Sequence, residues 1–303
     1  MRWTMKTVLV TGATGRQGGA AARALRADGV AVRALVRNLE APAVAGLREH
    51  GVEIASGNLD DPPSLRAACR GVDAVFSVQT PDLKDLGGDS ETRHGRNLVE
   101  AALAERVPQF VHTSVSGAGD HHRGVPGWKE GRWKTLEHYW ESKAYLDELV
   151  KDAGFPHWTV LRPSMFMENF VRPSFLFANW VENRLLTVLK PDTRLSLIAV
   201  DDIGKAVARI IAEPERFDGR NLELAGDVRS LREISAVLSE AWKTKVEAPD
   251  LTPEEALAQG LLPAFVHSQR YLNENPSPAR PDEARALGLS PRTFAQWVHA
   301  TWP

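Results

Sequence analysis

The sequence contains almost no cysteine, little net charge and no long apolar run. Its 303 residues include one cysteine, Cys69, so no disulfide can form within the chain. The formal net charge of −2 at pH 7 gives no field that would attract nucleic acid or an anionic membrane. Apolar runs such as 74–78 are far shorter than the roughly 20 residues that a membrane-spanning helix needs. A strand pattern begins at Thr7, which leaves no room for a signal peptide. These absences favour a cytoplasmic protein without a nucleic-acid or membrane partner.

What is present is an ordinary globular composition in a regular alternation. Hydrophobic residues make up 43% of the chain and charged residues 25%, and the chain is long enough to bury a sizeable core. Short apolar runs, typical of strands buried on both faces of a parallel sheet, lie at 7–10, 31–36, 52–55, 74–78, 110–113 and 158–161. Helical patterns separate them at 15–28, 65–69, 97–105 and 136–152. The alternation predicts an α/β fold with a doubly wound parallel sheet.

The pattern loosens after residue 163. An aromatic stretch at 165–183 predicts a helix, followed by a strand at 195–200, a helix at 202–213, a strand at 221–224 and a helix at 231–242. The remaining residues are rich in Pro and Ala and show no further alternation. We therefore expect a first domain over 1–164, completed by about 197–229, and a smaller C-terminal lobe formed by 165–196 and 230–303.

A glycine-rich stretch, "VTGATGRQGG" at 10–19, joins the first strand to the first helix. Gly12, Gly15 and Gly18 have the spacing that permits a tight turn, close approach of the backbone to a pyrophosphate, and close packing of helix on strand. The pyrophosphate then lies at the positive N-terminal end of the helix. Glycine is common in turns of every kind, but in this strand–turn–helix context the motif predicts a dinucleotide site.

The end of the second strand indicates which dinucleotide binds. Sites for NAD normally carry Asp or Glu at this position, to bond the ribose 2′-hydroxyl. Here the strand ends "ALVRN", and its Arg37 offers a forked cation that matches a 2′-phosphate. Arg16, within the glycine turn, is a second candidate for this phosphate. We therefore predict NADPH/NADP, the alternative for Arg37 being a solvated loop residue.

Several blocks of the chain together resemble the NmrA-like proteins, an atypical branch of the extended short-chain dehydrogenases/reductases. The blocks are "VTGATGRQGG", "RALVRN", "GNLDDPPSLRAACRGVDAVFSV", "RNLVEAALAERVPQFVHTSVSGAG", "ESKAYLDELV" and "WTVLRPSMFMENF". The resemblance covers most of the first 170 residues and continues more loosely through "LIAVDDIGKAVA". It implies NADP(H) binding, a Rossmann domain, and a small C-terminal lobe over the nicotinamide end.

The same resemblance implies where the cofactor lies. Asn58 and Leu59 would lie beside the adenine, and Asn58 departs from the aspartate more usual there. Lys143 would bond the hydroxyls of the nicotinamide ribose, and Pro163 with Met165 would contact the nicotinamide ring. The complete predicted cofactor site comprises Gly12, Thr14, Gly15, Arg16, Gln17, Gly18, Arg37, Asn58, Leu59, Val78, Gln79, Thr80, Lys143, Pro163 and Met165.

The catalytic candidates lie in "HYWESK" at 138–143. Tyr139 and Lys143 are four residues apart and so share one face of a helix, in the Y-x-x-x-K pattern that short-chain reductases use for proton transfer. We expect the ammonium, together with the positive nicotinamide of the oxidised cofactor, to lower the pKa of the tyrosine, which would donate a proton as hydride arrives. Ser114 or Ser116 would hold the substrate oxygen. The alternative is a chance pattern on an amphipathic helix, and NmrA-like sensors often keep the lysine without the tyrosine.

Two further groups of residues have less specific patterns. His121, His122 and His138 fit no closed set of ligands, so we predict no metal. A long link at 119–140 carries Trp128, Trp133 and Trp140, and Phe166 and Phe170, with Phe175 and Trp180, follow it in the chain. These aromatic residues either line a pocket for a flat apolar guest or pack the lobe interior.

The sequence therefore favours an NADPH-dependent oxidoreductase that transfers hydride to an apolar aromatic carbonyl, a quinone or a conjugated enone. One alternative is a sensor of the NADP(H) redox state that binds a protein partner without turnover. Another is a lyase or isomerase that recycles its cofactor within one turnover. Related folds use the helices at 97–105 and 136–152 for dimers, so a homodimer is also expected by analogy.

Overall fold

The computed structural model describes residues 6–82, 85 and 87–302. The chain divides into two compact units. The first unit contains the residues up to Gly119, together with His138–Arg162 and Val200–Leu222. The second contains Asp120–Glu137, Pro163–Ala199 and the residues from Glu223 onward. The sequence placed residues 120–137, 163–164, 197–199 and 223–229 in the first domain, whereas their contacts assign them to the second unit.

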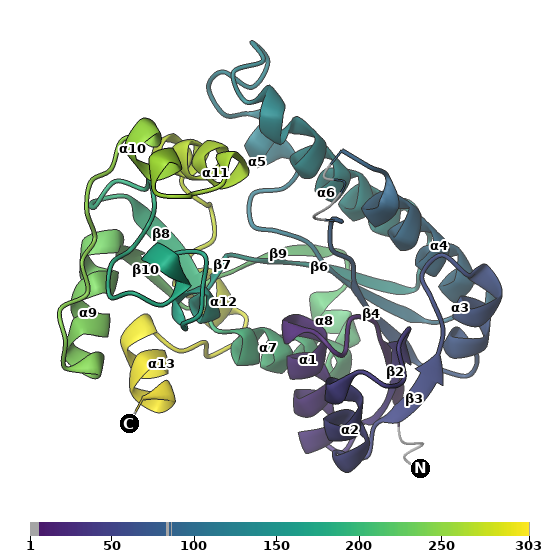
Figure 1. The fold of residues 1–303 in the computed structure, drawn as a ribbon. Helices are drawn as coiled ribbons and strands as arrows, with labels where there is room; N and C mark the ends of the chain where they lie inside the picture. Colours follow the sequence, from purple (N-terminus) through teal and green to yellow (C-terminus); the bar gives the residue numbers. More distant parts are fainter. Residues whose placement is uncertain (1–5, 83–84, 86, 303) are drawn as a thin grey trace. The chain divides into compact units, whose positions relative to one another are not determined.

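A seven-stranded sheet forms the centre of the first unit (Figure 1). The strands β1 to β6 pair in parallel in the order β3-β2-β1-β4-β5-β6, and β9 extends the sheet beside β6. All residues of β4 and β5 are buried, which is why these strands are continuously apolar or carry bonded polar groups. The predicted α/β fold with a doubly wound sheet is confirmed. The bounds are β1 Thr7–Val10, β2 Ala31–Val36, β3 Glu53–Ser56, β4 Ala74–Val78, β5 Gln109–Thr113, β6 His157–Pro163 and β9 Arg220–Leu224.

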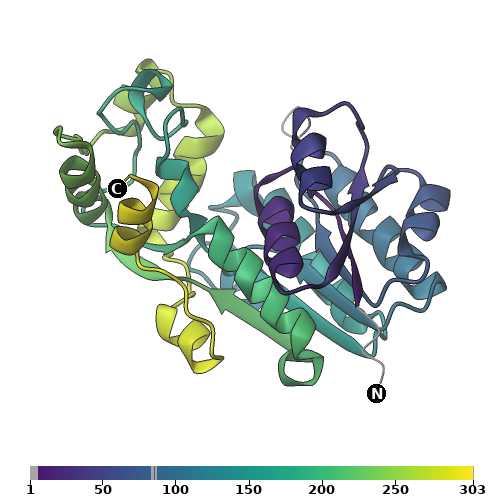
Figure 2. The same ribbon diagram turned by 90° about the horizontal axis from the view of Figure 1, so that it is seen from below.

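Helices cover both faces of this sheet. On one face, α1 and α7 lie side by side, and a Cβ at Gly204 of α7 would come within 2.5 Å of the Ala20 carbonyl oxygen of α1 (Figures 1 and 2). On the other face, α3, α4 and α6 contribute to one hydrophobic cluster with the strands. The helices of this unit are α1 Arg16–Ala27, α2 Pro42–Glu49, α3 Pro62–Cys69, α4 Ser90–Ala104, α6 Lys134–Asp152, α7 Val200–Ala212 and α8 Pro214–Phe217. The first turn of α6, up to Glu137, belongs to the second unit.

Cys69, the sole cysteine, lies at the end of α3 inside this hydrophobic cluster. Its side chain is fully buried. Burial and, to a smaller extent, Glu105 raise the pKa of its thiol to about 12, against an opposing effect of Arg33. Cys69 therefore behaves as a small apolar core residue.

The second unit has its own three-stranded sheet, in the order β10-β8-β7, and its own core. Three of its helices begin with a capping box, for example Ser230 with Glu233 at the start of α9. Its elements are α5 Asp120–Arg123, β7 Met165–Phe166, η1 Met167–Phe170, η2 Ala178–Trp180, β8 Arg194–Ile198, β10 Asp227–Ser230, α9 Leu231–Trp242, α10 Pro253–Ala258, α11 Pro263–Glu274, α12 Pro281–Ala286 and α13 Phe294–Thr301.

The predicted helix at 165–183 is wrong. This stretch contains a two-residue strand and two short 3-10 turns, η1 and η2. Pro173 interrupts it, because a proline inside a helix removes a hydrogen bond and clashes with the preceding turn. Phe170 and Phe177 are buried in the core of the second unit, whereas Trp180 is exposed.

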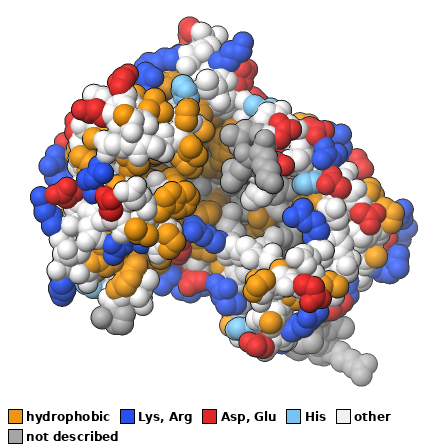
Figure 3. Space-filling view, viewed as in Figure 1, with side chains coloured by type: hydrophobic (Ala, Val, Ile, Leu, Met, Phe, Trp, Pro, Cys, Tyr) orange, Lys and Arg blue, Asp and Glu red, His pale blue; other side chains and the backbone are white. Residues whose placement is uncertain are grey.

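Two observations concern the molecular surface. No helix within the described ranges is long and apolar enough to span a membrane. On the face seen in Figure 3, basic and acidic side chains are interspersed and form no large field of one sign.

Candidate cofactor site and active site

The glycine turn adopts the conformation that its spacing predicts. Gly12 has a φ of +62°, a left-handed conformation that favours glycine, and its carbonyl accepts a hydrogen bond from the Gly15 amide at 2.9 Å. A Cβ at Gly18 would come within 2.4 Å of the Gly12 carbonyl oxygen. The first helical turn of α1 can therefore approach the strand end only because residue 18 has no side chain.

The N-terminal end of α1 is suited to an anion. Gly15 is the N-cap of α1 and provides no side-chain cap, and the first turn contains no acidic residue. Thr11 fixes this turn against β4, since the Val78 amide donates to its Oγ1 at 2.8 Å and its hydroxyl donates to the Val78 carbonyl at 3.1 Å. The turn thus lies between β1 and β4, where the strand order reverses and α/β sheets bind ligands.

The arginines predicted to bind a 2′-phosphate follow the ends of β2 and of the glycine turn. Arg37 follows the last residue of β2, and Arg16 begins α1. Both side chains are exposed, as is Thr14. Gln17 points towards β5, where its Oε1 accepts a hydrogen bond from the Thr113 hydroxyl at 2.8 Å.

Other predicted cofactor residues make contacts within the protein. The Asn58 side chain accepts a hydrogen bond from the Asp60 amide at 3.2 Å, and Leu59 is partly buried against the core. Gln79 is buried and exchanges hydrogen bonds with the Ser77 hydroxyl. Their contacts with a cofactor stay predictions, as do those of exposed Thr80, and of Pro163 and Met165 in the second unit.

Lys143, on α6, forms a buried ion pair that the sequence did not reveal. Its Nζ donates to Oε1 of Glu91, in the first turn of α4, at 2.5 Å. Lys143 is 6% exposed and Glu91 is 4% exposed. Burial alone would lower the pKa of Lys143, but the Glu91 carboxylate raises it above its usual value, with smaller contributions from Tyr139 and Asp147. Lys143 is therefore held as an ammonium.

Tyr139 lies beside this pair, one turn earlier on α6. The Lys143 Nζ is 5.9 Å from the centroid of the tyrosine ring, so the two side chains share a face as expected. Although 38% of the residue is exposed, burial of its hydroxyl end raises the pKa of Tyr139. Lys143 lowers this pKa and Glu91 raises it. Lys143 acts in the expected direction, but in the protein without cofactor burial and the Glu91 charge together outweigh it, so the pKa of Tyr139 is raised.

A second buried polar cluster lies deeper in the sheet. His112 of β5 makes a hydrogen bond through Nδ1 to the Ser77 hydroxyl of β4 at 3.3 Å, and its Nε2 lies 4.0 Å from Oδ1 of Asp147 on α6. Asp147 pairs with Arg162 of β6 at 2.7 Å. Burial, with smaller contributions from Lys143 and Arg162 and against a hydrogen bond to Ser77, lowers the pKa of His112 to about 3, so its imidazole is neutral.

The two candidate serines follow β5 and are both buried. The Ser114 hydroxyl lies against the Asp147 carboxyl group. Burial raises the pKa of Asp147 above its usual value, although Arg162 and Ser114 oppose this rise. Within the described part of the chain, the Ser114 Oγ makes no hydrogen bond of good geometry. Ser114 therefore lies in the polar cluster around Asp147, and the role of Ser114 or Ser116 towards a substrate stays a prediction.

Sequence reasoning missed Glu91, His112, Asp147 and Arg162. A signal existed for Asp147, which continues the four-residue spacing of Tyr139 and Lys143 along α6. Another existed for His112, a polar residue inside the otherwise apolar strand β5. Glu91 carries no local signal, since only the packing of α4 against α6 brings it to Lys143.

The aromatic residues predicted to line a substrate pocket lie in different surroundings. Trp133 is buried, donates from Nε1 to the Pro126 carbonyl at 2.9 Å and packs edge-on against Tyr271. Phe170 is fully buried against Phe294 and is a core residue, which corrects its assignment to the pocket. Trp128 packs edge-on against His122, and Trp140 packs edge-on against Tyr139. Phe166 is half-buried and lies in β7.

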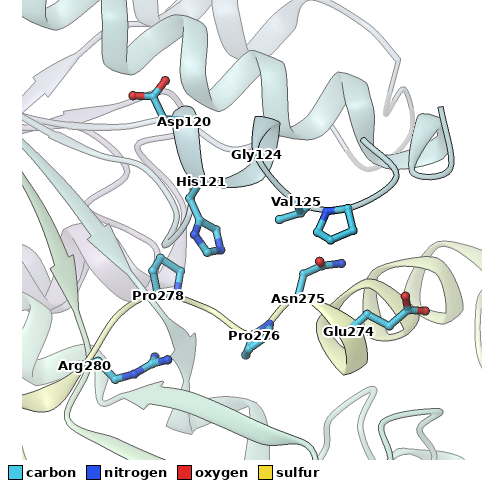
Figure 4. A pocket seen from close by; sticks show the side chains of 10 residues that line it. Asp120, His121, Gly124, Val125, Glu274, Asn275, Pro276, Pro278 and Arg280 are labelled. Carbon is cyan, nitrogen blue, oxygen red and sulfur yellow. The ribbon is translucent and has the colours of Figure 1, made fainter. Parts of the chain in front are cut away.

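A cavity of about 680 Å³ lies within the second unit (Figure 4). Its walls come from residues 120–126, which include α5, and from 274–280, after α11. His121 points from α5 towards the segment of Pro276 and Pro278. None of the predicted pocket aromatics lines this cavity, which carries the charged residues Asp120, Glu274 and Arg280. Over the described residues, no group of three His, Cys, Asp or Glu side chains is placed to hold a metal ion.

Comparison with known proteins identifies relatives over nearly the full length. The NAD(P)H azoreductase of Xenophilus azovorans is 27% identical over 307 residues, covering 97% of this chain and 97% of the azoreductase. The NADPH-dependent quinone oxidoreductase of Escherichia coli, solved with NADPH, has a TM-score of 0.74 at 20% identity. The match covers 98% of this chain and 100% of the quinone oxidoreductase chain. NmrA, a negative transcriptional regulator solved with NADP, has a TM-score of 0.77 at 19% identity, and the match covers 99% of this chain and 96% of the NmrA chain. The NmrA-like family profile itself matches residues 4–298, and the chain therefore belongs to the NmrA-like family.

Proposed function

We propose that the protein is an NADPH-dependent oxidoreductase that transfers hydride to an apolar aromatic carbonyl, a quinone or a conjugated enone. The observation that carries the proposal is the pairing of Tyr139 and Lys143 on one face of α6, beside a buried carboxylate. The full-length relation to an NAD(P)H azoreductase supports a reductase that uses this cofactor. The geometry of the glycine turn supports a dinucleotide at the carboxyl edge of the sheet.

The residues present fit NADP(H). The N-terminal end of α1 has no side-chain cap and no acid in its first turn, as a pyrophosphate site requires. Exposed Arg37 and Arg16 supply cations for the 2′-phosphate. Lys143 would present an ammonium to the hydroxyls of the nicotinamide ribose, and the family resemblance implies that Pro163 and Met165 would contact the nicotinamide ring. When bound, NADPH supplies the hydride.

Tyr139 supplies the proton. Its raised pKa keeps the phenol protonated at neutral pH, which is the state that a general acid needs when a carbonyl oxygen gains negative charge. The Oη proton passes to the substrate oxygen, and the nearby Lys143 ammonium stabilises the phenolate that remains. Ser114 or Ser116 orients that oxygen. The substrate of this reaction is apolar and aromatic. The protein acts in the cytoplasm. The homodimer expected by analogy with related folds would use α4 and α6.

The test is NADPH oxidation against a panel of quinones, enones and aromatic ketones, with Tyr139→Phe beside the wild type. We expect turnover to fall about a hundredfold or more in the variant while NADPH still binds, since a general acid contributes rate and not cofactor affinity. Tyr145→Phe is the matched control, because Tyr145 is the other tyrosine of α6 and is equally exposed. Equal turnover of Tyr139→Phe and wild type would overturn the role of Tyr139.

A second candidate function is a redox sensor, because a transcriptional regulator is among the proteins of similar fold. A sensor must bind a partner differently in its NADPH-bound and NADP-bound forms. Tight NADPH binding without turnover of any panel compound, together with a partner that distinguishes the two forms, would favour it. A lyase or isomerase would convert substrate without net consumption of NADPH.

A further inference from the structure

Glu91 is a buried charge that the proposed reaction does not use. It is 4% exposed, and its carboxylate contacts the Lys143 ammonium at 2.5 Å, although the two residues are 52 positions apart in the chain. An isolated buried charge is very costly, and a buried pair persists only with good geometry. The position of Glu91 therefore calls for a role connected with Lys143.

The packing of α4 against α6 fixes this carboxylate in place. A Cβ at Gly95, one turn after Glu91, would come within 2.3 Å of Leu146 Cδ2, so the two helices are in close contact there. His138 of α6 makes a hydrogen bond to the Gly88 carbonyl, just before α4, at 3.0 Å. Arg96 donates to the Tyr145 hydroxyl at 3.3 Å. These contacts lie on both sides of the Glu91–Lys143 pair along α4. The helix dipole at the start of α4 also favours a carboxylate.

Among the residues that the structure describes, no other charged group takes the place of Glu91 beside Lys143. Tyr139 and His112 face the ammonium but are neutral at neutral pH. Asp147 contributes more weakly, and its carboxylate is already paired with Arg162. Without Glu91, burial would favour the uncharged amine at residue 143.

We propose that Glu91 is a positioning residue of the active site, whose carboxylate keeps Lys143 charged and holds its ammonium where the nicotinamide ribose binds. This inference rests on the proposed function for the role of Lys143 towards the cofactor. It adds that the site is completed from a second helix, α4, through a residue that need not touch substrate.

The first experiment needs neither cofactor nor turnover. The protonation of Lys143 is followed by NMR of its side-chain Cε and Nζ, with Lys143→Gln used to assign the signal. In the wild type we expect the ammonium to persist at alkaline pH, whereas in Glu91→Gln its pKa should fall by about 2 units or more. The control is Glu100→Gln, at an exposed glutamate on α4, which should leave the pKa of Lys143 unchanged. An unchanged Lys143 titration in Glu91→Gln overturns the proposal.

The second experiment measures NADPH affinity against pH. Wild type and Glu91→Asp should bind with little pH dependence near neutrality, and Glu91→Gln should lose affinity as the pH rises and Lys143 is deprotonated. A flat profile in Glu91→Gln, despite a fallen Lys143 pKa, overturns the positioning role. If both experiments succeed while no compound is reduced, the inference stands and the proposed reductase function fails.

A double-mutant cycle covers the case in which Glu91→Gln does not fold. Removing one partner leaves an uncompensated buried charge, whereas removing both does not. The double variant Glu91→Gln/Lys143→Gln should therefore be more stable than the sum of the single variants predicts. Additive losses of stability would contradict the pairing on which the proposal depends.

Discussion

At Tyr139, three influences of different sign act on one hydroxyl. The sequence revealed the ammonium of Lys143, which lowers the pKa, but not the burial and the Glu91 charge that raise it. Spacing along one helix predicts which side chains share a face, and Tyr139 and Lys143 do. It says nothing about residues on other elements, so Glu91 and His112 depended on tertiary packing. The net sign of a pKa shift was therefore beyond the reach of a local motif.

His112 leads to a prediction about acid stability. Its folded-state pKa of about 3 lies below the ordinary value of 6.5, so the unfolded chain binds the proton more strongly. Stability should therefore be lost as the pH falls from 6.5 towards 3. In His112→Gln we expect this part of the pH dependence to disappear from free energies of unfolding measured in urea. His50→Gln, an exposed histidine after α2, should keep it, and equal pH dependence in both variants would contradict the assignment.

At the scale of the elements, strands were predicted more reliably than helices. Strands such as β1, β2 and β4 are buried on both faces, so their short apolar runs have sharp ends. The helix α2 was not predicted, because it is short and buries only Val44 and Leu47. The stretch at 165–183 has helix-like aromatic spacing but folds irregularly, since its side chains pack in several directions.

The crossing of α1 and α7 should not tolerate a side chain at Gly204. Its Cβ would lie 2.5 Å from a backbone oxygen of Ala20, and a backbone atom cannot yield as the end of a flexible side chain can. We expect Gly204→Ala to lower the free energy of unfolding by about 1–3 kcal/mol. Gly46→Ala on α2 is the control, because its Cβ would meet nothing within 4 Å. That control should be neutral or stabilising by about 0.5–1 kcal/mol. Equal effects of the two substitutions in denaturant unfolding would refute the close approach.

At the scale of the whole molecule, two units each have their own sheet and their own hydrophobic core. The chain passes between them repeatedly, at points such as 119–120 and 199–200. The sequence predicted one return of the chain to the first unit, at about 197–229, but not its earlier passage through the second unit at 120–137. The link at 120–137 has no strong periodicity, so its membership of the second unit depended on contacts with distant residues such as Tyr271 and Glu274.

Cofactor binding should stabilise the folded protein selectively. A ligand that binds only the folded state raises the melting temperature, by an amount that grows with the logarithm of its concentration divided by its dissociation constant. We expect NADPH to raise it more than NADH does, because exposed Arg37 can pair with the additional phosphate. Arg37→Ala should lose about tenfold or more in NADPH affinity while NADH binding stays unchanged. Arg48→Ala, an exposed arginine on α2, is the control. Retention of the NADPH preference in Arg37→Ala would show that another group selects the cofactor.

The burial of Cys69 also makes the natural chain an unusually convenient subject for site-specific labelling. A thiol with a pKa of about 12 inside a packed core offers almost no thiolate to maleimides or to oxidants at neutral pH. A cysteine introduced on an exposed position of either unit would therefore react alone, without first mutating the native one. A fluorophore pair attached in this way, one on each unit, would report how the distance between them responds to NADPH.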